Sequence, residues 1–202
     1  MNQSIENLEL FALGMTLFPD GMIALNIFEP RYLSMVKRHH QRDEPFGIIT
    51  LLQGFEVSLP GQPTALASGG TLAKIIHFEQ IQPAFFRIQC VGLKRFKVSK
   101  RLSVGAGVEH VNADLMDFDP EVPIPSDLQN TADALGKFIV HNQQQGLKLN
   151  EFPFSQPFRL DECGWVANRW AELLTIERQQ KVDLLLEPDP LRRLQRIKTI
   201  MS

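Results

Sequence analysis

A turn, an apolar run and a helix start follow one another between Leu17 and Tyr32, and this order constrains the fold more than any other feature. Pro19-Asp20-Gly21 predicts a turn, because proline presets φ, aspartate can bond its own backbone and glycine tolerates positive φ. Met22–Phe28 is apolar except for Asn26, which suits a strand covered on both faces, although periodicity alone also allows a helix. Pro30 suits the first position of a helix, where no N–H is needed. The stretch therefore predicts a turn-strand-helix unit.

Short apolar or alternating segments predict further strands through the first 115 or so residues. With Met22–Phe28, the predicted strands are Leu8–Phe11, Phe46–Leu52, Phe55–Leu59, Thr71–Phe78, Phe85–Val91, Phe96–Ser99 and Val108–Ala113. Gly92 interrupts the alternation and predicts a bulge or a tight corner. Many short strands, one early helix and frequent glycine corners predict a small curled sheet or pseudo-barrel.

Four amphipathic helices are predicted after a linker at Asp117–Ser126, in which three prolines prevent a regular helix. The first two are expected to begin at a Ser126–Gln129 capping box and at an Asp161 N-cap. The third is expected to begin at Thr175 and the last at Asp189-Pro190, while Gly146 is the predicted end of the first. Short connections between them predict a bundle. The predicted organisation is α+β, with a β-rich domain at 1–116 and a linker with helices at 117–202.

Composition narrows the classes of function. The 202 residues are 44% hydrophobic, which is enough for a sizeable core, and the net charge of −2 argues against general nucleic-acid binding. Two cysteines, Cys90 and Cys163, make a disulfide framework implausible, so both are predicted to be reduced and buried. The N-terminus shows no signal-peptide pattern, and no run of eighteen apolar residues could span a membrane. A cytosolic protein with no membrane association is predicted.

Three consecutive motifs point to a known family. They are Leu10-Phe11-x-Leu13-Gly14, then Leu17-Phe18-Pro19-x-Gly21, then Leu25-x-Ile27-Phe28-Glu29-Pro30-Arg31-Tyr32. This pattern resembles the N-terminal substrate-binding domain of the Lon (La-type) ATP-dependent proteases, which also occurs in cereblon and in stand-alone bacterial proteins. Phe46–Ile49, Gly92–Phe96 and a helical tail fit as well. Two residues depart from the pattern: Ala12 stands where the family usually has proline, and Asn26 where it often has histidine.

The resemblance implies a PUA-like barrel and a domain that captures unfolded or tagged polypeptides. The chain contains neither a Gly-x-x-x-x-Gly-Lys-[Ser/Thr] phosphate loop nor a Gly-x-Ser-x-Gly motif, so it is predicted not to be an enzyme. A scattered Ser/His/Asp set would leave no such motif, so a hydrolase of that kind stays an open alternative. The histidines lack metal-ligand spacing, and no metal or cofactor is expected. The Glu29–Arg31 pair is interpreted as a helix brace rather than as an acid-base pair.

A basic cluster near the Gly92 corner has two interpretations. Its members are Lys94, Arg95, Lys97, Lys100 and Arg101. They could contact phosphates, as in a PUA-like nucleic-acid binder, or form the solvated face of an exposed hairpin, where lysines also protect a sheet edge from pairing. The acidic balance elsewhere favours the solvated face.

Aromatic residues after position 150 also allow two interpretations. Phe152, Phe154 and Phe158, with Trp165 and Trp170, could close the seam between barrel and helices, or could line a groove for hydrophobic peptide segments. The seam is favoured, and the exposure of the rings discriminates between the two interpretations.

The leading hypothesis is a non-catalytic module that recognises unfolded or client polypeptides by edge addition or by groove binding. Protease or chaperone machinery is a further candidate partner. An alternative is a small-molecule or regulatory sensor with a pocket between barrel and bundle, and the PUA-like nucleic-acid binder is a second one. The candidate polypeptide-binding residues are Phe18, Phe28, Tyr32, Phe152 and Phe154.

Overall fold

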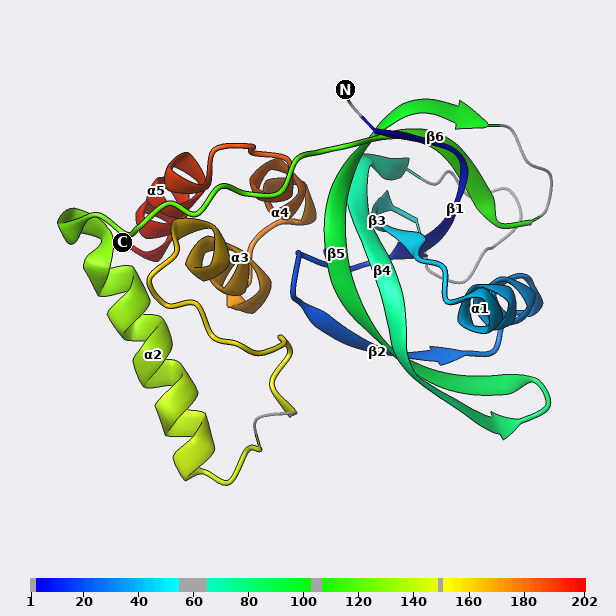
Figure 1. The fold of residues 1–202 in the computed structure, drawn as a ribbon, viewed down its shortest axis with the longest axis horizontal. Helices are drawn as coiled ribbons and strands as arrows, with labels where there is room; N and C mark the ends of the chain where they lie inside the picture. The colour runs from blue at the N-terminus through cyan, green and yellow to red at the C-terminus, as the bar shows by residue number, and fades with distance from the viewer. Residues whose placement is uncertain (1–2, 55–64, 103–106, 149–150) are drawn as a thin grey trace.

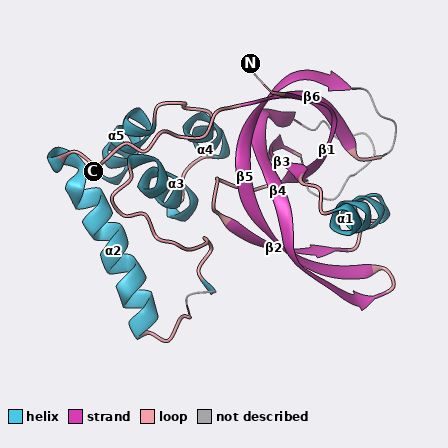
Figure 2. Cartoon of the chain, in the orientation of Figure 1, coloured by secondary structure: helices cyan, strands magenta, loops and turns pink. Residues whose placement is uncertain are grey.

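The β-rich and helical parts of the chain lie side by side along the longest axis of the molecule (Figure 1). The structure is a computed structural model that describes residues 3–54, 65–102, 107–148 and 151–202. Strands gather in one part, where α1 accompanies them, and the other helices form the second part (Figure 2). The predicted α+β organisation is therefore confirmed. The predicted strand at 55–59 lies outside the described residues.

Six strands form one curled sheet in the described part of the chain. They are β1 (Ser4–Leu13), β2 (Met22–Ile27), β3 (Phe46–Gln53), β4 (Ala65–Gln82), β5 (Phe85–Leu102) and β6 (Glu109–Leu115). Their order is β2-β5-β4-β3-β1-β6, and a further β5–β6 pairing closes the sheet into a pseudo-barrel. The long β5 pairs with β4 on one side and divides its other side between β2 and β6. This division leaves β2 at the end of the sheet.

The bulge predicted at Gly92 is present. The register between β4 and β5 shifts between Gly92 and Arg95, where β5 uses one residue more than β4. The strand bends there and continues to Leu102, so one long strand replaces the two that were predicted. Gly92 also donates its N–H to the carbonyl of Gly21 at 2.8 Å, and a Cβ at Gly92 would overlap the carbonyl oxygen of Phe18. The missing side chain lets the Leu17–Gly21 turn lie directly on β5.

Helix α1 (Pro30–Arg42) follows β2 as predicted, with Pro30 in its first turn. Its buried residues Tyr32, Met35 and Val36 pack into the barrel cluster that also contains Phe11 and Phe46. These three residues form the face of α1 that covers this end of the barrel.

Four α-helices make up the C-terminal part: α2 (Gln129–Gln144), α3 (Cys163–Leu173), α4 (Arg178–Leu185) and α5 (Pro190–Met201). The predicted number is correct for the described residues. Gly146 follows α2 with φ of +94°, a conformation in which glycine carries no steric penalty. The Asp189 carboxylate accepts hydrogen bonds from the N–H groups of Leu191 and Arg192, so the predicted start of the last helix is confirmed.

The other helix starts differ from the predictions. Ser126 begins a 3₁₀ turn (Ser126–Leu128) without a side-chain cap, so the predicted capping box is wrong. Helix α3 begins at Cys163 rather than after Asp161, because the linker holds the preceding residues extended. Cys163 donates its N–H to the carbonyl of Val122 at 2.8 Å. At α3, a hydrogen bond to the linker therefore takes the place of the local cap that the sequence pattern suggested.

Helix α4 begins at Arg178 rather than at Thr175. The Glu177 side chain accepts a hydrogen bond from the backbone of Gln180, and the Gln180 side chain accepts one from the N–H of Glu177. This reciprocal pair is a capping box, and it satisfies N–H groups that the first turn of α4 leaves without partners.

Packing crosses from one part of the molecule to the other in both directions. Phe18, from the turn before β2, lies in the core of the helical part. Val182 of α4 and Leu186, directly after this helix, pack into a barrel cluster with Phe96. The last strand ends at Leu115 and the next helical element begins at Ser126. The division into 1–116 and 117–202 stays a prediction.

Candidate functional site

The loop that carries Phe152, Phe154 and Phe158, named the aromatic loop, lies against the start of β2. The N–H of Met22 donates to the carbonyl of Pro153 at 2.8 Å, and the N–H of Ser155 donates to the carbonyl of Asp20 at 2.8 Å. Gly21 and Phe154 form an isolated antiparallel bridge between these two hydrogen bonds. The loop therefore pairs with the first position of β2 on the side that faces away from β5.

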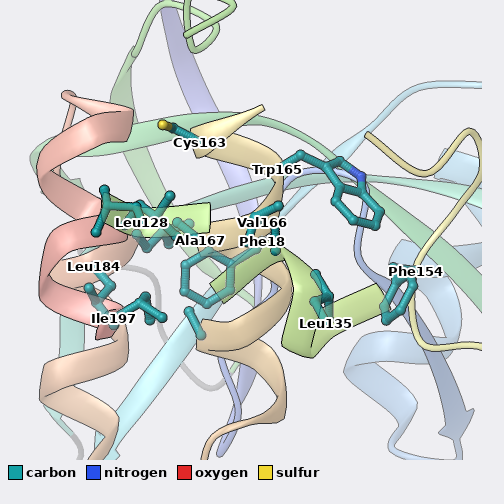
Figure 3. Packing of buried hydrophobic residues seen from close by; sticks show 14 of the residues in the cluster. Phe18, Leu128, Leu135, Phe154, Cys163, Trp165, Val166, Ala167, Leu184 and Ile197 are labelled. Atoms are coloured by element: carbon teal, nitrogen blue, oxygen red, sulfur yellow. The ribbon is translucent and has the colours of Figure 1, made fainter. Parts of the chain in front are cut away.

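The rings of Phe152 and Phe154 are buried in the cluster that also contains Phe18 from the turn before β2. Phe154 packs at right angles to Trp165, with 5.7 Å between ring centroids, and Phe152 lies next to Phe154. Figure 3 shows Phe18 among Leu135, Val166 and Ala167 of the helical core. The burial of Phe152, Phe154 and Trp165 supports the seam interpretation, whereas Phe158 and Trp170 are half-buried and pack against the helical cluster.

Only one of the five predicted binding residues presents its ring to solvent. Phe18, Phe152 and Phe154 are buried in the helical core, and Tyr32 is buried against Phe11 at 4.0 Å between ring centroids. A partner could not reach these four rings in this structure, because the protein's own core already covers them. Phe28, directly after β2, is 55% exposed and stays a predicted contact.

A buried ion pair between Arg169 and Glu172, which no sequence motif indicated, contacts the backbone of the turn before β2. Arg169 of α3 donates from Nη2 to the carbonyl of Pro19 at 2.6 Å, and its Nε lies 3.0 Å from Oε2 of Glu172. Burial raises the pKa of Glu172 to about 7 against the opposing effect of Arg169. Burial likewise lowers the pKa of Arg169. The i,i+3 spacing of the two residues on a helix was the one available signal.

We expect this carboxyl group to make stability depend on pH. The pKa of Glu172 rises from an ordinary value of 4.5 to about 7 on folding, so the folded state holds its proton more tightly than the unfolded chain does. The contribution of Glu172 is fully present below pH 4.5 and is lost as pH rises to about 7, amounting to about 3 kcal/mol. Urea unfolding between pH 4.5 and 7 measures this slope. Glu172→Gln should flatten it, whereas the exposed control Glu6→Gln should leave it unchanged; an unaltered slope in Glu172→Gln would contradict the assignment.

Asp119 of the linker joins the barrel to the last helix. Arg193 of α5 donates to both of its carboxylate oxygens, at 2.6 and 3.0 Å, and also to Oδ1 of Asn168 at 2.8 Å. Arg95 of β5 pairs with the same carboxylate and donates to the carbonyls of Leu185 and Glu187. Two buried guanidinium groups therefore share one carboxylate.

The position of Arg95 corrects the interpretation of the basic cluster. Arg95 is 3% exposed, and burial, with Arg193 beside it, lowers the pKa of Arg95 to about 10. Lys97 and Lys100 are exposed, while Arg101 donates to the backbone of the neighbouring β4 at Leu66. Arg95 is thus a buried residue that joins parts of the fold and belongs to neither interpretation, whereas the exposed Lys97, Lys100 and Arg101 match the favoured solvated face of a hairpin.

A cavity of about 220 Å³ lies at the junction of the two parts, where the sensor hypothesis placed a pocket. Its walls include Asp119, Arg95, Asp20 and Arg159. Asp119 pairs with Arg95, and Arg159 pairs with Asp20, so these charges already have partners within the protein. The residues that the structure describes contain no group of three or more His, Cys, Asp or Glu side chains placed to bind a metal ion. Cys90 and Cys163 are free and buried, as predicted.

The free edge of β2 is the candidate functional site. β5 pairs with one side of β2, and on the other side, among the described residues, the loop Pro153–Ser155 bonds to Met22 and no strand follows. Ala24 and Asn26 are exposed along this edge, and Phe28 is exposed at its end. None of the described helices is long and apolar enough to cross a membrane. The cytosolic location stays a prediction.

Comparisons with known proteins agree with this fold. The family model of the ATP-dependent protease La (LON) substrate-binding domain matches residues 7–202, and no curated protein matches the chain. A solved Lon N-terminal domain protein from Xanthomonas campestris is 26% identical, with a TM-score of 0.75 over 98% of this chain and 100% of that one. The N-terminal domain of a Mycobacterium avium complex Lon protease shares the fold at 15% identity, with a TM-score of 0.55 over 98% and 97% of the two chains. This protein therefore belongs to the Lon substrate-binding domain family, whose members are substrate-recognition modules.

Proposed function

We propose that this protein binds unfolded or client polypeptides and catalyses no reaction on them. The observation that carries the proposal is the family match, which extends over residues 7–202 and so includes both the barrel and the helices. A recognition module needs accessible apolar side chains or free backbone groups, and the edge of β2 with Phe28 offers both.

The buried charged groups support a role without catalysis. Arg95 and Arg193 each pair with Asp119 and donate to nearby carbonyl groups, and Arg169 pairs with Glu172 and donates to the turn before β2. Each of these groups joins two elements of the fold, which is a structural role. Protease or chaperone machinery as a further partner stays a prediction from the family.

A binding titration tests the proposal. We expect a fluorescently labelled, reduced and carboxymethylated α-lactalbumin, which is permanently unfolded, to gain anisotropy with a dissociation constant in the micromolar range, about −7 to −8 kcal/mol. Native α-lactalbumin is the matched control and should not bind, because its apolar segments and strand edges are not available. No binding of the unfolded form at tens of micromolar would reject the proposed function.

A further inference from the structure

The outer edge of β2 carries backbone groups without a strand partner. β2 stands at the end of the sheet order and pairs only with β5 among the described strands. Ala24 and Asn26 lie in the middle of this strand and are both exposed. The segment Met22–Ile27 contains neither a charged residue nor a proline, which are the usual protections of an exposed edge.

The pairing register shows which groups face outward. Gly92 donates to the carbonyl of Gly21, so the hydrogen-bonded positions on β2 continue at every second residue, at Ile23, Leu25 and Ile27. The N–H and C=O groups of the alternate residues Met22, Ala24 and Asn26 must then point away from β5. Met22 agrees with this, because its N–H donates to the aromatic loop and not to β5.

The aromatic loop demonstrates that this edge accepts an extended chain. Residues Pro153–Ser155 form two backbone hydrogen bonds with Asp20 and Met22 in antiparallel orientation. Among the residues that the structure describes, no further backbone hydrogen bond follows on this side of β2, and the outward groups of Ala24 and Asn26 come next along the strand. An added strand that pairs with Ala24 and Asn26 would therefore extend the backbone pairing that the loop makes with Asp20 and Met22.

We propose that an extended segment of a bound polypeptide adds to this edge as a further strand, with its backbone bonded to Ala24 and Asn26. This inference rests on the proposed function and specifies its mode of binding. The small side chains of Ala24 and Asn26 leave room for an approaching backbone, and Leu25 is a partly buried member of the barrel cluster. Apolar side chains at alternate positions of the segment would contact Leu25, and the exposed ring of Phe28 would lie at the end of the added strand. The preferred partner is therefore an unfolded segment with alternating apolar residues and no proline.

A pair of double variants tests this inference. Ala24→Pro/Asn26→Pro removes the two outward N–H groups and leaves the hydrogen bonds to β5, which use the other residues of β2. Ala24→Thr/Asn26→Thr keeps both N–H groups and suits a strand. We expect the proline variant to bind unfolded α-lactalbumin at least about tenfold more weakly than the wild type, and the threonine variant to bind within about threefold of it. Circular dichroism verifies that both variants are folded.

Three outcomes separate the claims. If the wild type does not bind, the proposed function fails. If the wild type and the proline variant bind equally well, the proposed function stands and edge addition is overturned. If the proline variant does not fold, amide hydrogen exchange of the wild type tests edge addition instead. Saturation with the unfolded protein should then slow exchange at Ala24 and Asn26, and unchanged exchange at both amides would overturn the inference.

Discussion

Asp119→Asn should destabilise the folded protein by about 3–5 kcal/mol, a large part of the stability of a typical domain. Arg95 and Arg193 are both buried, and the Asp119 carboxylate is the acidic side chain that bonds to each of them. Asparagine keeps the shape of the side chain but removes its charge. Two guanidinium groups would then remain in the interior with carbonyl partners and without this carboxylate. Their positive charges would repel each other.

Urea unfolding monitored by tryptophan fluorescence measures this effect, and Asp117→Asn is the matched control. Asp117 lies two residues earlier in the same linker and is exposed, so its substitution should change the free energy of unfolding by less than about 0.5 kcal/mol. Equal unfolding midpoints for Asp119→Asn and the wild type would show that the two arginines do not depend on this carboxylate.

Phe18→Ala should cost about 3–5 kcal/mol, since it deletes a fully buried ring from a closely packed core. The loss is not confined to the barrel that supplies the residue. Phe18 packs among helical residues, so its removal opens a cavity at the seam and weakens the attachment of the helices to the barrel. The turn that carries Phe18 cannot simply move inward to fill the space, because Gly92 and Arg169 already hold its backbone.

Phe28→Ala is the control for this experiment, because it removes the same side chain ten residues later from an exposed position. Its expected effect on the unfolding free energy is below about 0.5 kcal/mol. A cost of less than about 1 kcal/mol for Phe18→Ala would mean that the seam relaxes around the missing ring, contrary to the packing described above.

The contacts of Asp119 and Phe18 also affect the proposed binding edge. The loop Pro153–Ser155, which pairs with the start of β2, belongs to the helical part, whereas β2 belongs to the barrel. Asp119 and Phe18 hold these parts together. They therefore preserve the position of the loop beside Met22, which leaves the following residues of β2 open to a partner.

Local patterns in the sequence were sufficient to predict much of the fold. The Leu17–Tyr32 unit, the bulge at Gly92 and the four C-terminal helices follow from turn chemistry, from hydrophobic periodicity and from the conformational freedom of glycine, which act over a few neighbouring residues. The motifs of the same N-terminal stretch also identified the family correctly.

The exposure of individual side chains could not be predicted in this way. Phe18 and Phe28 have the same chemistry, yet one fills the helical core and the other faces solvent. Arg95 stands in a basic run but is buried beside Asp119, which lies 24 residues away in the chain. Such outcomes depend on which distant segment covers a residue. Burial is a property of the assembled surfaces, and a local pattern specifies only which face of a strand or helix is available to be covered.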